Sequence, residues 1–131
     1  MLTRIVNTLP KRAGWGAGFT AYLTTQLING LAHGYLPFLR LNPLPPLYRS
    51  GVRYQLEPNH GAGWEEYADP WTVYARKWGD CDDLNLWRVM ELLAKGEKKA
   101  QARAEWSGNQ VHVLVRRGNG KLEDPSKILG G

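Results

Sequence analysis

The sequence has only one cysteine, Cys81, among its 131 residues. A single thiol excludes an internal disulfide framework and any zinc site built from cysteine pairs, and it agrees with a reducing compartment. The three histidines are scattered and form no zinc-binding pattern. We therefore expect neither a metal nor another cofactor.

Acidic residues are missing from the first fifty positions, although the whole chain has twelve of them. The same stretch holds five of the seventeen basic residues, which accounts for the net charge of +5 because the other twelve balance the acids. These five are Arg4, Lys11, Arg12, Arg40 and Arg49. The excess indicates an ordinary basic surface or an arm that contacts an acidic partner. Nucleic-acid binding is unlikely, since no dense basic patch or basic-aromatic module is present.

No apolar run is long enough to cross a membrane. Residues 13–39 carry no charged side chain, but threonine, asparagine, glycine and Pro37 interrupt them. A spanning helix needs about 20 consecutive, mostly apolar residues, and no short apolar block precedes a cleavage site. We expect no membrane contact and no signal peptide. The 43% apolar fraction instead predicts one folded domain.

Apolar spacing predicts two long helices. Over 19–36, apolar residues recur at intervals of three and four, which predicts a leading amphipathic helix that packs on the core or binds a partner. A second helix, over 82–95, has a continuous apolar stripe. Asp82 and Asp83 in its first turn complement the helix dipole, and Gly96 is placed to end it as a left-handed cap.

The order of the remaining segments predicts an α+β fold. Residues 1–16 read as a weakly structured lead, and a proline-rich connector at 43–46 marks the one plausible boundary. We accordingly divide the chain into 1–42, a basic lead and helix, and 43–131, a compact core. An edge strand is predicted within 48–57.

Behind the second helix the sequence predicts a small antiparallel sheet. Strict alternation predicts a strand at 100–106, a valine-rich run predicts another at 111–115, and a short third strand at 121–124 ends at Pro125. Asn119 precedes a glycine, a signal for a hairpin between the last two strands. The residues after Pro125 read as a tail.

Three residues in this core suggest nucleophilic chemistry. Cys81 stands at the start of the second helix, where unpaired N–H groups and the helix dipole stabilise a thiolate and an oxyanion. His112 lies in a predicted strand and can act as the base, and Asp124 at a strand end can orient it. The alternative is that Cys81 is a buried structural thiol. The neighbouring carboxylates would oppose a thiolate, so we expect them to cap the helix and face away from the sulfur.

The hairpin loop decides whether this triad is geometrically possible. With a two-residue turn, Asp124 would lie opposite Val115 and on the other face of the sheet from His112. With a three-residue loop, 118–120, Asp124 pairs with Leu114 and shares a face with His112, about 7–8 Å away between backbones. The triad therefore predicts an odd-length loop with a glycine bulge.

Aromatic residues crowd the segment before Cys81. Asp69 and Pro70 predict a helix start by N-cap and first-turn preferences. The rings of Trp71, Tyr74 and Trp78 either pack in the core or form the walls of a substrate groove.

Taken together, these motifs resemble the transglutaminase-like cysteine enzymes, a branch of the papain-like fold. The resemblance rests on a Gly-Asp-Cys-Asp-Asp start of a helix, a strand histidine, and an Asp-Pro-Ser segment (residues 79–83, 112 and 124–126). A longer pattern, including Pro-Pro-Leu-Tyr at 45–48 and Trp-Arg at 87–88, is similar to the short transglutaminase-like proteins of tailed phages and prophages.

The resemblance implies a nucleophile helix packed on a small antiparallel sheet and preceded by a leading helix. It implies Cys81 as nucleophile, His112 as general base and acid, and Asp124 as orienter, acting on a protein or peptide by amide hydrolysis or acyl transfer. Trp78 and Tyr74 are candidate oxyanion donors, with Trp71 as a cleft residue. A phage protein of this kind would act in the host cytoplasm or on the virion. The competing expectation is a non-catalytic assembly protein whose N-terminal third binds a phage structural protein.

Overall fold

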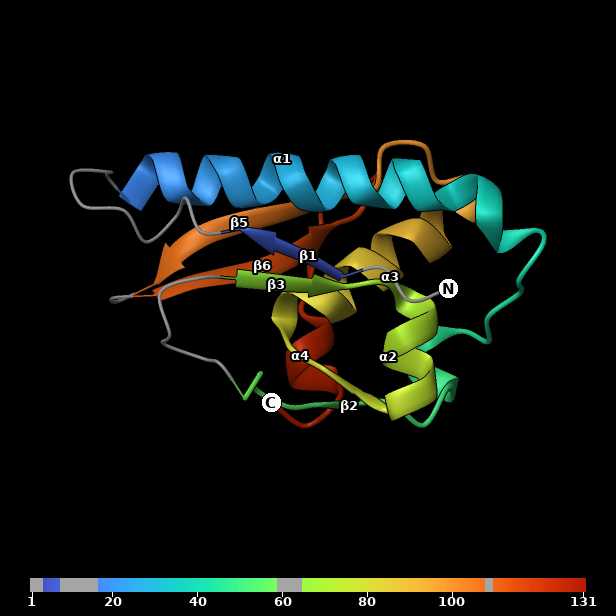
Figure 1. Cartoon of the computed structure of the whole chain (residues 1–131). Helices are drawn as coiled ribbons and strands as arrows, with labels where there is room; N and C mark the ends of the chain where they lie inside the picture. The colour runs from blue at the N-terminus through green and yellow to red at the C-terminus, as the bar shows by residue number, and fades with distance from the viewer. Residues whose placement is uncertain (1–3, 8–16, 59–64, 108–109) are drawn as a thin grey trace.

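The computed structural model describes residues 4–7, 17–58, 65–107 and 110–131, which form a mixed α+β fold (Figure 1). Its α-helices are α1 (Ala17–Tyr35), α2 (Pro70–Arg76), α3 (Cys81–Ala94) and α4 (Pro125–Ile128), and two short 3-10 helices, η2 (Leu36–Leu39) and η3 (Leu47–Arg49), follow α1. Its strands are β1 (Arg4–Asn7), β2 (Arg53–Tyr54), β3 (Glu65–Ala68), β4 (Trp78–Gly79), β5 (Gln101–Ser107), β6 (Gln110–Arg116) and β7 (Leu122–Glu123).

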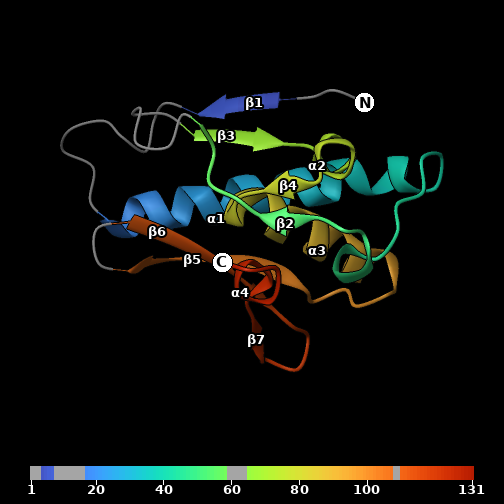
Figure 2. The same cartoon turned by 90° about the horizontal axis from the view of Figure 1, so that it is seen from below.

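The strands form three small sheets. β5, β6 and β7 make an antiparallel sheet in that order, with Ala104 opposite Val113 and Val115 opposite Glu123. β1 pairs antiparallel with β3, and β2 pairs parallel with β4. Helix α1 lies along the β5–β6 ribbon (Figure 1), and the view from below places β2 and β4 beside α3 (Figure 2). This confirms the α+β class and the leading helix.

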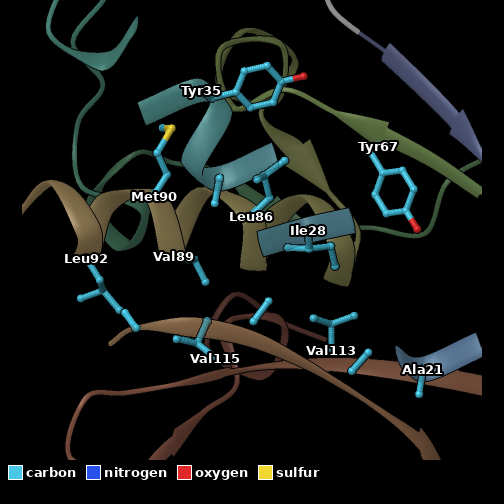
Figure 3. Close-up of a cluster of buried hydrophobic side chains, with 14 residues drawn as sticks. Ala21, Ile28, Tyr35, Tyr67, Leu86, Val89, Met90, Leu92, Val113 and Val115 are labelled. Carbon is cyan, nitrogen blue, oxygen red and sulfur yellow. The ribbon is translucent and has the colours of Figure 1, made fainter. Parts of the chain in front are cut away.

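Helix α3 lies between two hydrophobic clusters and is the centre of the molecule. On one side Leu86, Val89 and Met90 pack with residues of α1 and β6, such as Ile28 and Val113 (Figure 3). On the other side, Leu84 and Trp87 pack with Leu47, Val52 and Val73. Few positions of α3 face solvent, because both sides are covered.

Both ends of α3 have the caps that the sequence predicts. At its start, Asp80 accepts a hydrogen bond from the Asp83 N–H at 3.1 Å, and the Asp83 carboxylate accepts one from the Asp80 N–H at 3.3 Å. At its end, Gly96 has φ +94°, which favours glycine, and its N–H donates to the Leu93 carbonyl.

Helix α1 belongs to the same hydrophobic core as α3, β5 and β6. Ile28 and Ala32 are fully buried in the cluster with α3 and β6. Asn29 bonds both backbone groups of Ala102 on β5, its Nδ2 donating at 3.0 Å and its Oδ1 accepting at 2.7 Å. These bonds cover the open edge of β5, which would otherwise present unpaired backbone groups. The division at residue 42 stays a prediction.

Two segments differ from the sequence-based prediction. Residues 4–7 were expected to be weakly structured, but they form β1, whose partner β3 lies far along the chain. The C-terminal residues were expected to be a tail, but Pro125 begins the helix α4, with Asp124 as its N-cap. Pro125 has the φ of a first helical residue, so the proline that ends β7 also starts α4.

Among the described residues, no helix has the length and apolar character of a membrane span.

Candidate active site

Cys81 is the first residue of α3, and only Asp80 separates it in the sequence from the short strand β4. The capping box of Asp80 and Asp83 fixes the point at which the helix begins, and the thiol is half-buried there. The N–H groups of a first helical turn have no partners within the helix. The prediction that Cys81 stands at the start of this helix is confirmed.

Asp83 anchors the start of α3 to its surroundings. Its side chain is fully buried, accepts a hydrogen bond from the Ala68 N–H at 2.9 Å, and contacts Arg76 at 2.9 Å. Burial and the nearby Asp80 carboxylate raise the pKa of Asp83 well above its usual range, and the Ala68 N–H acts in the opposite direction. Asp83 is thus a structural carboxyl group that joins β3, α2 and α3.

The only group of possible metal ligands among the described residues is Glu57, Asp80 and Asp83, whose ligand atoms lie within 4.8 Å of one another. The Arg76 guanidinium contacts Glu57 at 3.2 Å and Asp83 at 2.9 Å. It also stacks on the Trp78 ring, 3.5 Å from its centroid. Arg76 therefore supplies positive charge to these carboxylates from within the chain, and the cluster has a structural explanation.

Asp82 does not face away from the sulfur, and this expectation is wrong. Its Oδ1 lies 3.9 Å from Cys81 Sγ, and its side chain is buried. The expectation of a capping role holds for Asp80 and Asp83 only. A carboxylate at this distance opposes a thiolate and favours a thiol that donates to it.

His112 and Asp124 meet directly. His112 Nε2 lies 2.9 Å from Asp124 Oδ2, with side-chain exposures of 33% and 23%. The other oxygen of Asp124 accepts a hydrogen bond from the Lys127 N–H at 3.3 Å, as the N-cap of α4. With Nε2 donating to the carboxylate, His112 has its lone pair on Nδ1, which is the nitrogen that can take a proton.

The hairpin between β6 and β7 has the loop that the triad requires. The Arg117 N–H donates to the Lys121 carbonyl at 2.8 Å, so the loop is 118–120. Gly120 has φ +85°, and Val115 pairs with Glu123, which puts Asp124 opposite Leu114. The predicted three-residue loop with a left-handed glycine is confirmed. The excluded two-residue turn would have turned Asp124 to the other face.

Asn85 links the first turn of α3 to β6, and the sequence analysis missed it. Its Nδ2 donates to the Cys81 carbonyl at 2.7 Å and to the Val113 carbonyl at 3.0 Å. Val113 is the neighbour of His112, so one fully buried amide holds the backbone of Cys81 beside the strand of His112. The available signal was a polar residue within the apolar stripe of α3, one helical turn after Cys81.

Tyr54 is a second residue that the sequence analysis missed. Its strand β2 pairs with β4, with Tyr54 opposite Gly79, two residues before Cys81. Burial raises the pKa of the Tyr54 phenol, and the negative charges of Cys81, Asp80 and Asp124 raise it further. A raised pKa keeps the phenol a neutral O–H donor on the strand that pairs with β4.

Glu123 fixes the position of β7 relative to α3. It accepts hydrogen bonds from Arg88 Nε at 2.6 Å and Arg117 at 3.0 Å, and also from the Tyr48 hydroxyl. Burial raises the pKa of Glu123, but the hydrogen bonds from Arg88 and Tyr48 outweigh burial and lower it overall. Because Arg88 and Cys81 both belong to α3, this network joins the helix of Cys81 to the residue beside Asp124.

The three aromatic candidates have packing contacts. Trp71 meets Tyr35 edge to face, with 6.0 Å between centroids, and donates from Nε1 to the Asn42 carbonyl at 2.6 Å. Tyr74 packs edge to face on Trp87, and Trp78 is half-buried under Arg76. Their roles as cleft or oxyanion residues stay predictions.

Comparison with known proteins finds no matching family model, no similar curated protein and no similar solved structure.

Proposed function

We propose that this chain is a transglutaminase-like cysteine enzyme that cleaves or transfers acyl groups through a thioester on Cys81. The observation that carries the proposal is the 2.9 Å contact between His112 Nε2 and Asp124 Oδ2, made possible by the odd-length hairpin loop. A histidine that is oriented by a carboxylate and leaves Nδ1 available is the arrangement of a general base.

In the proposed reaction, the Cys81 sulfur attacks the carbonyl carbon of an amide, while His112 holds the thiol proton. The tetrahedral oxyanion is stabilised by N–H groups at the start of α3, and the neutral Tyr54 phenol is a further candidate donor. The C–N bond then breaks, and His112 gives the proton to the leaving amine. Water or a second amine then attacks the thioester carbon while His112 takes its proton. The C–S bond breaks, the acid or the new amide leaves, and His112 returns the proton to the Cys81 sulfur.

The proposal is tested by acylation with p-nitrophenyl acetate, which releases a coloured product and leaves an acetyl thioester on the nucleophile. We expect intact-mass spectrometry to find one acetyl group on Cys81, and His112→Ala to slow the release of p-nitrophenolate strongly. Cadaverine added to the acyl-enzyme distinguishes acyl transfer from hydrolysis, because only transfer gives acetyl-cadaverine. An adduct elsewhere in the chain, or a rate unchanged by His112→Ala, contradicts the proposal.

A second candidate is a phage assembly protein that keeps the fold but works by binding. Two observations favour it: the Asp82 carboxylate opposes a Cys81 thiolate at 3.9 Å, and Phe19 and Tyr22 of α1 are 48% and 61% exposed. Deleting residues 1–40 would remove the core residue Ile28, so the docking test is the surface variant Phe19→Ser/Tyr22→Ser. Loss of a virion-protein complex in this variant, with Cys81 acylation absent in the unmodified chain, would support the second candidate.

A further inference from the structure

A cavity of about 630 Å³ opens between the C-terminal half of α1, the segment that joins α3 to β5, and the β6–β7 hairpin. Figure 1 shows the segment between α3 and β5 passing beside this part of α1. The lining residues are polar or basic for the most part, and they include no aspartate or glutamate. The volume is in the range of small-molecule sites, about 300–1,000 Å³.

The positive charge of the cavity comes from Lys98, Lys99, Arg116 and Arg117. Arg117 is already bound to a carboxylate, since it contacts Glu97 at 2.8 Å. Lys98, Lys99 and Arg116 are exposed and form no ion pair with any residue in the part of the chain that the structure describes. Their charge is therefore available to a ligand.

This contrasts with the arginines that hold the fold together. Arg76 binds Glu57 and Asp83, and Arg88 binds Glu91 and Glu123. Each structural guanidinium thus meets carboxylates from the chain, whereas Lys98, Lys99 and Arg116 of the cavity meet none among the described residues.

The walls of the cavity are fixed by hydrogen bonds that do not use its free cations. On the α1 side, Asn29 bonds both backbone groups of Ala102, and the Thr25 hydroxyl accepts from the Ala104 N–H at 2.9 Å. On the hairpin side, Arg117 forms two bonds to Glu97, at 2.8 and 2.9 Å. A ligand would therefore meet a site whose backbone is already in place, which reduces the entropy lost on binding.

We propose that this cavity binds a small polyanion bearing phosphate or carboxylate groups. Arg116 can donate two parallel N–H bonds to such a group, and the two lysines add point charges that suit either kind of oxyanion. The amide side chains of Gln26 and Gln101, both exposed in the lining, add neutral donors. The site is separate from the proposed base, because Arg116 lies four residues along β6 from His112, about 13 Å away along the strand.

The test is a titration of the full chain with pyrophosphate and, separately, with citrate, followed by amide NMR shifts. We expect saturable shifts that are largest at residues 98–101 and 116–120. Shifts with pyrophosphate alone indicate a site for phosphate groups, shifts with citrate alone indicate a site for carboxylate groups, and shifts with both indicate a site that accepts either. The cavity variant Lys98→Ser/Lys99→Ser/Arg116→Ser is expected to weaken binding at least tenfold.

The matched control is Arg40→Ser/Arg49→Ser/Arg53→Ser, which removes the same charge from exposed positions outside the lining. We expect its affinity to stay within about twofold of the unmodified chain, because surface charges outside the cavity add little at physiological salt. Absence of saturable shifts with both anions overturns the proposal. Equal weakening in the two triple variants overturns it as well, because binding would then reflect net charge alone.

Discussion

Asp124 divides its carboxylate oxygens between two tasks, so Asp124→Asn separates them. One oxygen caps α4 through the Lys127 N–H, and the other contacts His112 at 2.9 Å. Asparagine is about as good an N-cap as aspartate, whereas alanine costs about 1 kcal/mol at such a position. Asparagine keeps the cap but removes the charge that faces the histidine.

The structure gives the expected size of each effect. The His112–Asp124 contact is about a quarter to a third exposed, so its own contribution to stability is about 0.5–1 kcal/mol. We therefore expect Asp124→Asn to lower the free energy of unfolding in urea by at most about 1 kcal/mol, and Asp124→Ala by about 2 kcal/mol, the sum of cap and contact. We expect Asp124→Asn to have a larger effect on the reactivity of Cys81, because an amide can hold the His112 imidazole in the wrong tautomer.

The assay is the rate at which iodoacetamide alkylates Cys81, measured below the free thiol pKa of about 8.5. Asp124→Asn is expected to slow alkylation at least tenfold, a change of about 1.4 kcal/mol, while the protein stays folded. The matched control is Asp69→Asn, which changes the N-cap of α2, where the aspartate bonds the Thr72 N–H at 2.9 Å. Equal alkylation rates in Asp124→Asn and the unmodified chain would refute the orienting role of Asp124.

Four other changes have expected outcomes. Asp82→Asn should speed Cys81 alkylation at least about fivefold, since removing a charge 3.9 Å from the sulfur is worth about 1 kcal/mol even in bulk water, and Asp82 is buried; an unchanged rate would mean that Asp82 does not oppose the thiolate. Asn85→Leu should lower the free energy of unfolding by about 2–3 kcal/mol, because two carbonyls lose their donor; a loss below that of the exposed-site variant Gln55→Leu would count against the bridge. Glu123→Gln should cost about 2 kcal/mol in urea, compared with little for the exposed control Glu105→Gln, because Arg88 and Arg117 lose their shared carboxylate. The Arg117 hydrogen bond is the main cause that lowers the pKa of Glu97 from 4.5 to about 2. This pair therefore stabilises the fold above pH 4.5 and loses its effect as the pH falls toward 2. Glu97→Gln should lower the free energy of unfolding by about 0.5–1 kcal/mol at neutral pH and leave it unchanged near pH 2.

Local signals in the sequence were sufficient for the helix that begins at Cys81 and for the presence of the β6–β7 hairpin. The caps of α3 depend on residues within a few positions of its ends, such as Asp80 and Gly96, and these have strong intrinsic preferences. The loop at 118–120 followed from the requirement that Asp124 share a face with His112, since the side-chain period of a strand is two residues. These features are determined by neighbours in the chain.

The residues that the sequence analysis missed depend on contacts between distant segments. The partner of β1 is β3, far along the chain, and Tyr54 lies opposite Gly79 only because β2 pairs with β4. Asn85 has a clear role only once α3 is placed against β6. Hydrophobic periodicity gives the face of each element but not which elements meet, so these contacts could not be assigned from one sequence.

The central claim is that His112 controls the reactivity of Cys81. The most direct measurement is the pH profile of Cys81 alkylation in the unmodified chain and in His112→Gln, with folding checked by circular dichroism. We expect the alkylation rate of the unmodified chain to rise at a pH well below the pKa of a free thiol. We expect His112→Gln to shift this rise toward about pH 8.5 or above. Identical profiles in the two proteins would contradict the claim.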